Sequence, residues 1–119
     1  MTSLVACLST GKGTWASVSR LLQVGSWDKV YLLTNDFGIQ NFQKDAKTEL
    51  LVINENVDLS VLRDQIKALL HQKLQGEMDV AVHFVSGSGK EHMALVAALI
   101  QLGVGIRLVD VGKNGLEEL

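Results

Sequence analysis

The amino-acid sequence predicts an α/β fold in which five mainly parallel strands form one sheet with helices on both faces. Short apolar runs alternate with longer segments whose apolar residues recur every three or four positions, the pattern of buried strands separated by amphipathic helices. Apolar residues make up 47% of the 119-residue chain and charged residues 20%, a composition typical of a folded domain. This length suits one hydrophobic core, so we expect residues 1–119 to form a single domain with a short polar tail at about 111–119.

The first half of the chain supplies three of the expected strands. Leu4–Leu8, Lys29–Leu33 and Leu50–Ile53 are short apolar runs, each followed by a polar residue, as expected for buried strands. Between them, apolar residues at helical spacing predict helices at about Thr14–Val24 and Ile39–Lys47. The residues expected to face inward from the second of these helices are Ile39, Phe42 and Ala46.

The second half of the chain continues the alternation. Asp58 can cap a long amphipathic helix that reaches about Gln75. The apolar run Val80–Val85 predicts the fourth strand, and a helix that is apolar on nearly every side begins near Lys90. Ile106–Val109 predicts the fifth strand. Right-handed crossovers and the commonest layout of such sheets give the strand order 3-2-1-4-5, which defines a Rossmann-like three-layer sandwich.

Two turns of similar composition follow the first and fourth strands. They read Ser9-Thr10-Gly11-Lys12-Gly13 and Ser86-Gly87-Ser88-Gly89-Lys90. In the order 3-2-1-4-5, the carboxyl ends of these two strands flank the crevice where such folds bind ligands. Glycines allow a ligand to approach the backbone, a helix N-terminus favours anions, and lysine adds a positive charge. The sequence therefore predicts a phosphate-binding site here, against the simpler interpretation that both segments are only tight turns.

The net charge, the cysteine and the histidines narrow the classes of ligand. A formal net charge of −2 argues against a broad basic surface for duplex nucleic acid. Cys7 lies in an apolar run and is expected to pack in the core. His83 is expected to be a hydrogen-bonded core residue and His71 a solvated one; the histidines lack metal-ligand spacing, so neither a metal nor a cofactor is expected. No apolar run approaches the roughly 20 residues of a membrane span, so we expect a cytoplasmic protein.

One motif points to a nucleotide. The segment from Gly11 to Ala16 matches the dinucleotide-binding pattern G-x-G-x-x-A, and Asp36 follows near the end of the second strand. However, Ser9 and Thr10 separate the strand from the first glycine, where that pattern needs an immediate turn. Neither lysine-bearing turn fits the Walker A pattern. A nucleotide- or dinucleotide-binding regulatory module of the Rossmann type therefore stays open as an alternative.

The same segments resemble the CARF domains, the CRISPR-associated Rossmann folds. The resemblance lies in a first strand that ends in Ser9-Thr10-Gly11 and a fourth that runs through the Ser86–Lys90 turn into Glu91-His-Met-Ala-Leu, and it extends over about residues 3–110. It implies a homodimer that binds a cyclic oligoadenylate, such as cyclic tetra-adenylate, across its two-fold axis. For a stand-alone domain it implies a ring nuclease, which opens this second messenger and ends type III CRISPR signalling.

On this interpretation, ring opening needs no metal, because the ribose 2′-hydroxyl can attack its neighbouring phosphate. We expect Lys90 to stabilise the charge on the reacting phosphate, and Ser9, Thr10 and Ser88 to orient the phosphate and ribose. His92 is a candidate proton donor to the leaving oxygen, with a solvated or capping residue as its alternative. The other expected ligand-binding residues are Gly11, Lys12, Gly13, Asn35, Asp36, Ser86, Gly87 and Gly89.

Several interpretations stay open at the level of sequence. Asn35 and Asp36 could recognise ribose or an adenine edge, or only form a turn. Trp15 could stack on a base, although its helical spacing to Val18 favours core packing. Trp27 is expected in a loop. A sensor that binds the cyclic ligand without cutting it is the alternative to an enzyme.

Overall fold

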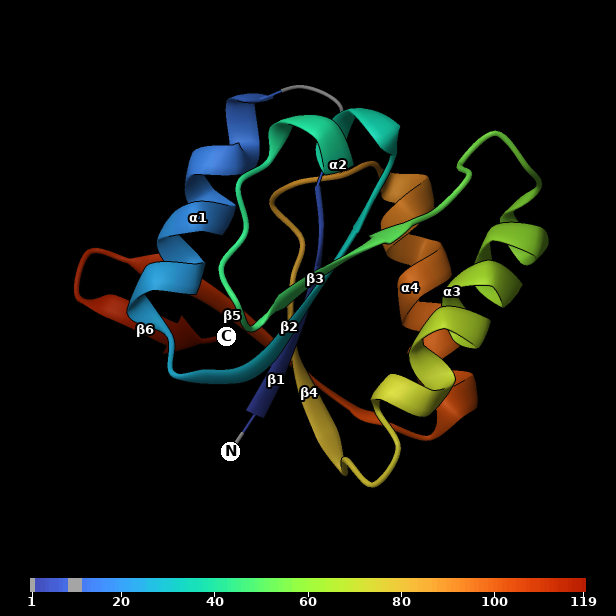
Figure 1. The fold of residues 1–119 in the computed structure, drawn as a ribbon. Coiled ribbons are helices and arrows are strands. Elements are labelled where there is room, and N and C mark those ends of the chain that lie inside the picture. Colours follow the sequence, from blue (N-terminus) through green and yellow to red (C-terminus); the bar gives the residue numbers. More distant parts are fainter. Residues whose placement is uncertain (1, 9–11) are drawn as a thin grey trace.

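The computed structural model describes residues 2–8 and 12–119 and contains one six-stranded sheet with the order β3-β2-β1-β4-β5-β6 (Figure 1). The first five strands are parallel and β6 is antiparallel to β5. This confirms the predicted α/β class and the order 3-2-1-4-5. The strands are β1 (Thr2–Cys7), β2 (Trp27–Thr34), β3 (Thr48–Val52), β4 (Asp79–His83), β5 (Gly105–Gly112) and β6 (Gly115–Glu118). The helices are a 3-10 turn (Lys12–Thr14), α1 (Trp15–Val24), α2 (Asp36–Asn41), α3 (Leu59–Lys73) and α4 (Gly89–Leu102).

Strand β1 is the centre of the fold. It pairs in parallel with β2 on one side, where Ala6 lies opposite Leu32, and with β4 on the other, where Ala6 lies opposite His83. Successive side chains of a strand point to opposite faces, so β1 contributes residues to two core clusters, one on each face of the sheet. Val5 and Cys7 face one cluster and Leu4 and Ala6 the other, and all four are fully buried.

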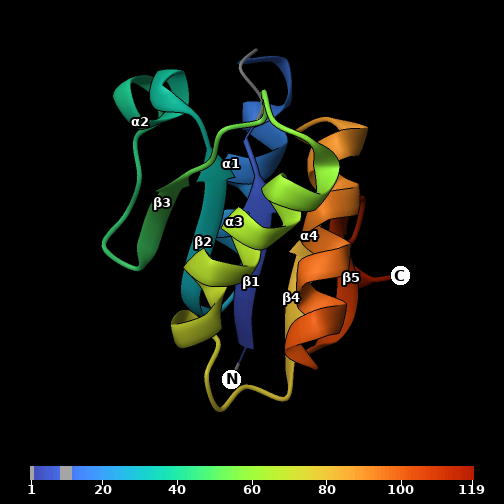
Figure 2. The same cartoon turned by 90° about the vertical axis from the view of Figure 1, so that its right-hand side faces the viewer.

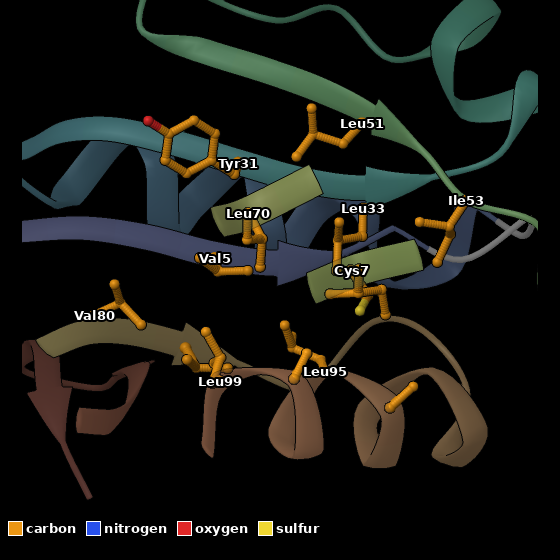
Figure 3. Packing of buried hydrophobic residues seen from close by; sticks show 14 of the residues in the cluster. Val5, Cys7, Tyr31, Leu33, Leu51, Ile53, Leu70, Val80, Leu95 and Leu99 are labelled. Atoms are coloured by element: carbon orange, nitrogen blue, oxygen red, sulfur yellow. The ribbon is translucent and has the colours of Figure 1, made fainter. Parts of the chain in front are cut away.

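The helices form the outer layers of the sandwich. Helices α3 and α4 lie side by side over the face that Val5 and Cys7 share, as Figures 1 and 2 show. Figure 3 shows the packing of this cluster, in which Leu95 and Leu99 of α4 face the sheet. Helix α1 covers the opposite face with Val18 and other apolar residues. The core therefore has two halves that share one sheet.

The sixth strand corrects the expectation of five strands followed by a short polar tail. Residues Gly115–Glu118 pair with β5, with Gly112 opposite Gly115 across a two-residue turn. Gly115 has a φ of 103°, a backbone conformation that residues with a Cβ atom rarely adopt. The polar residues of the tail are compatible with this position because β6 is an edge strand whose side chains are largely exposed.

The second helix also differs from the sequence prediction. Helix α2 begins at Asp36 and ends at Asn41, whereas the spacing predicted a helix over 39–47. Phe42 is buried as expected, but Ile39 and Ala46 are exposed. Asn35 explains the early start, because its side-chain oxygen accepts a hydrogen bond from the Gly38 N–H at 3.1 Å and caps the helix.

Trp27 is the first residue of β2, not a loop residue as predicted. Its side chain is buried, and its indole Nε1–H donates a 3.0 Å hydrogen bond to the carbonyl of Leu21 near the end of α1. The ring lies against Gly25, where a Cβ atom would come within 2.1 Å of Trp27 Nε1. The turn between α1 and β2 therefore requires glycine for space.

Among the described residues, none of the helices combines the length and the apolar character that crossing a bilayer requires.

We predict that Gly25→Ala lowers the free energy of unfolding by about 1–3 kcal/mol, because the added methyl group must displace the Trp27 indole. Urea denaturation followed by tryptophan fluorescence measures this. Gly89→Ala is the control, since a Cβ there meets no atom within 4 Å and its φ is not positive. Equal stability of the two variants would contradict the close packing of Trp27 on Gly25.

Candidate functional site at the carboxyl edge of the sheet

The loop after β4 lies directly on the end of β1. Gly87 has a φ of 102°, and a Cβ atom on it would lie 2.7 Å from the Cβ of Cys7, 3.1 Å from His92 Nε2 and 3.3 Å from Glu91 Oε1. Glycine is needed at this position both for its backbone conformation and for the close contact. Helix α4, which this loop leads into, therefore begins at the carboxyl end of β1.

Part of the loop after β1, one of the two predicted phosphate-binding turns, lies outside the described residues. The predicted site residues Ser9, Thr10 and Gly11 belong to that part. Lys12 and Gly13 form the 3-10 turn that leads into α1. A Cβ atom on Gly13 would meet no atom within 4 Å, so this position is not sterically restricted to glycine.

Ser88 and Glu91 form a capping box at the start of α4. The Ser88 hydroxyl oxygen accepts from the Glu91 N–H at 3.1 Å, and Glu91 Oε1 accepts from the Ser88 N–H at 2.7 Å. The expected role of Ser88 in orienting a ligand therefore competes with a structural one. Gly89 and Lys90 follow as the first residues of the helix, where backbone N–H groups have no partner within the helix itself.

Lys90 reaches across the edge of the sheet to the loop after β3. Its Nζ donates a 2.8 Å hydrogen bond to the backbone carbonyl of Glu55, and its side chain is exposed. This contact joins two loops that are 35 residues apart in sequence. The Glu55 carbonyl is neutral, so this contact does not compensate the positive charge of Lys90. An anionic ligand would form a stronger hydrogen bond with Lys90 than the carbonyl does.

Glu55 and Glu91 bring two carboxyl groups together at this edge. The two side chains lie close enough to interact, and Glu91 is only 5% exposed. Burial raises the pKa of Glu55, the negative charge of Glu91 and the hydrogen bond to it raise this pKa further, and Lys90 opposes the shift. Sequence reasoning missed both residues. The spacing of Ser88 and Glu91 is that of a capping box and could have indicated Glu91, but no local pattern marks Glu55.

Cys7 lies beneath this carboxyl pair. Burial raises the pKa of its thiol, and the charges of Glu91 and Glu55 raise it further. A thiol that stays protonated at neutral pH is a poor nucleophile. The structure thus agrees with the expectation that Cys7 is a core residue.

The His92 ring is held against the turn that precedes its helix. Its Nε2 lies 2.8 Å from the carbonyl oxygen of Ser86, to which it donates, and the ring stacks on Phe84 with 4.7 Å between centroids. Ser86 itself is buried. To protonate a leaving group through Nε2, His92 would first have to break its bond to Ser86.

The structure agrees with the roles expected for His83, His71 and Trp15. His83 is buried and its Nε2 lies 3.0 Å from Asp110 Oδ1, while His71 is exposed. Trp15 is buried and packs on the rings of Phe37 and Phe42, with centroids 5.7 and 5.5 Å away. Base stacking by Trp15 therefore has no support from its position.

A polar cavity of about 410 Å³ opens beside these loops, at the carboxyl ends of β2 and β3. Asn35 and Asp36, which the sequence suggested as ligand contacts, both line it. Asp36 is exposed, and the side chain of Asn35 caps α2. Glu55 lines the cavity as well, so the cavity is continuous with the loop that holds Lys90.

Comparison of the sequence with models of known protein families and with curated proteins gives no match. The fold defines a Rossmann-like α/β protein with its candidate site at the carboxyl edge of the sheet.

We predict that Glu55→Gln makes the protein more stable than the wild type at pH 7.5 but not at pH 4. The pKa of Glu55 is higher in the folded protein, so the native state binds more protons and stability falls as pH rises from the unfolded pKa through the folded one. Glutamine imitates the protonated carboxyl and removes this loss. Thermal unfolding at the two pH values measures the difference, with Glu117→Gln on β6 as the control. An equal effect of Glu55→Gln at both pH values would contradict the raised pKa of Glu55.

Proposed function

We propose that the protein binds a cyclic oligoadenylate at the carboxyl edge of its sheet and cleaves it. The observation that carries this proposal is the position of the Ser86–Lys90 loop. It lies on the end of the central strand, where Gly87 contacts Cys7, and it supplies a helix N-terminus and the Lys90 ammonium group. Such an arrangement favours a phosphate. The resemblance to CARF domains supplies the identity of the phosphate ester.

Phosphate binding requires a simple exchange at Lys90. In the structure its Nζ donates a hydrogen bond to the Glu55 carbonyl. A phosphate oxygen is a charged acceptor and forms a stronger hydrogen bond with an ammonium group than a carbonyl does. The amides of Gly89 and Lys90 at the start of α4 add donors, and Lys12 is the proposed second cation.

The cleavage step uses the ligand's own nucleophile. The ribose 2′-oxygen bonds to the adjacent phosphorus, the bond from phosphorus to the 5′-oxygen breaks, and the 2′-hydroxyl proton passes to solvent as the 5′-oxygen gains one. The products are a 2′,3′-cyclic phosphate and a 5′-hydroxyl. Lys90 stabilises the charge that develops on the phosphate oxygens, and Ser9, Thr10 and Ser88 orient the reacting groups. His92 is the proposed proton donor once it leaves the Ser86 carbonyl.

A homodimer suits a cyclic ligand with two-fold symmetry. The outer face of α4 supports this part of the proposal, because Met93 is 64% exposed and Ile100 is 66% exposed, seven positions apart on the same side of the helix. Burying both side chains against a second copy removes apolar surface from water. Two Lys90 residues would then serve one ligand.

We predict that cyclic tetra-adenylate incubated with the protein in excess EDTA yields linear products with 2′,3′-cyclic phosphate ends. Lys90→Ala should reduce the rate roughly 100-fold, as expected when a charge-stabilising group is removed. Chromatography of the products measures this, and circular dichroism confirms folding. Lys67→Ala is the control, since Lys67 lies on α3 and contacts Gln101.

Three results would count against this prediction in different ways. An intact ring that nevertheless binds would leave a sensor in place of an enzyme. Cleavage that requires an added metal ion would refute the proposed mechanism. A ring that does not bind would refute the ligand class itself.

We predict that the double substitution of Met93 and Ile100 by glutamate yields a monomer at concentrations where the wild type is dimeric, because two charges would have to be buried in the interface. Analytical ultracentrifugation measures the change. Met78→Glu is the control, since Met78 is 89% exposed but lies before β4 and not on α4. A wild-type protein that is monomeric at all concentrations would contradict the dimer.

A further inference from the structure

The Lys90 ammonium group acts on the Glu55 carboxyl group. Its 2.8 Å hydrogen bond goes to the backbone carbonyl of Glu55, and this contact brings its positive charge close to the side chain of the same residue. Glu55 is half-buried, so water screens the interaction only in part. A change in the position or the charge of the ammonium group therefore changes the stability of the ionised Glu55 carboxylate.

Glu91 opposes the ionisation of Glu55. It lies one position after Lys90 on α4, is only 5% exposed, and adds negative charge close to Glu55. Its Oε1 is held in place by the 2.7 Å hydrogen bond from the Ser88 N–H. Together with burial, this neighbour makes the ionised form of Glu55 depend on the Lys90 charge.

The other elements around Glu55 bring neutral or negative groups. From β1, Cys7 contributes a buried thiol, which its raised pKa keeps uncharged. From α2, Asp36 lines the same cavity as Glu55, and from α3 the uncharged Gln65 does so. Among the described side chains that act on the Glu55 carboxyl, Lys90 is thus the one cation.

An anion bound to Lys90 changes this balance. A charged acceptor takes the hydrogen bond of the ammonium group from the neutral Glu55 carbonyl, because it binds more strongly. The negative charge of the anion offsets the Lys90 charge that stabilises the Glu55 carboxylate, and it also repels this carboxylate. The ionised form of Glu55 is therefore less stable when the anion is bound than when it is not.

We infer that an anion that binds Lys90 is accompanied by one proton, which the Glu55 carboxylate takes up from solvent. The inference rests on the proposed function in taking Lys90 as the anion-binding group, and it adds a regulation of that site by pH. Binding is strongest where Glu55 is already protonated before the anion arrives, and it weakens as pH rises until Glu55 is ionised in both states. The pKa of Glu55 is raised without the anion and rises further with it, so affinity is lost on the neutral side of the ordinary glutamate range.

Sulfate is a suitable probe, because its charge stays constant between pH 5 and pH 8. Its binding is measured at constant ionic strength from the NMR shifts of the Gly89 and Lys90 amides. The wild type should bind sulfate about ten-fold more tightly at pH 5 than at pH 8, the order of effect that one nearby charge has on a carboxyl group. Lys90→Gln should lose most of the affinity at both pH values.

Glu55→Gln separates this proton uptake from a structural role of the side chain. Glutamine imitates the protonated carboxyl, so the variant should bind sulfate at both pH values as tightly as the wild type does at pH 5. Its affinity at pH 8 should thus increase, whereas loss of a structural contact would decrease it. Glu117→Gln on β6 is the matched control and should keep the pH dependence of the wild type.

Sulfate affinity of the wild type that does not change with pH would overturn the inference, as would a pH dependence that persists in Glu55→Gln and so belongs to another group such as His92. Sulfate binding that is undetectable at tens of millimolar, or unchanged in Lys90→Gln, would overturn it as well. The cleavage assay with cyclic tetra-adenylate is independent of these titrations. Ring cleavage with pH-independent sulfate binding would refute only the proton uptake, and proton-linked sulfate binding by a protein that neither binds nor cleaves the ring would refute only the proposed function.

Discussion

The burial of β1 on both faces and along both edges determines the rest of this structure. Leu4, Val5, Ala6 and Cys7 are fully buried, and parallel partners occupy both sides of the strand. A strand in this position must be central, so the chain must cross the sheet in both directions from it. Because the crossover helices pack on both faces, the loops after β1 and β4 begin at neighbouring positions. The crevice at the carboxyl edge is a consequence of this packing.

Packing and binding compete for the same groups at that edge. Ser88 caps α4 through Glu91, His92 bonds to the Ser86 carbonyl, and Lys90 bonds to the Glu55 carbonyl. Such bonds satisfy polar groups that would otherwise be unpaired in the free protein. Under the proposed function, a ligand that binds Lys90 would break its bond to the Glu55 carbonyl and so act on the loop after β3.

Charges of both signs lie close together at this edge. Lys90 and Glu91 in the first turn of α4 both act on the Glu55 carboxyl, and Asp36 lines the same cavity as Glu55. Burial and the negative charge of Glu91 raise the pKa of Glu55, whereas the positive charge of Lys90 lowers it.

The sequence by itself determined the class of the fold and the order of its first five strands. Those features follow from local periodicity and from the general rules of parallel sheets, which need no knowledge of specific contacts. Residues 111–118 and Trp27 were misjudged because pairing with β5 and contact with Gly25 are not encoded in local hydrophobicity.

Only the tertiary structure decided that Glu55 faces Glu91, that Lys90 binds the Glu55 carbonyl, and that Asn54 and Gln65 build a cavity with Asp36. The physical reason is distance along the chain. These residues come from one loop and three helices, α2, α3 and α4, and only the packing of these helices on the sheet brings them together.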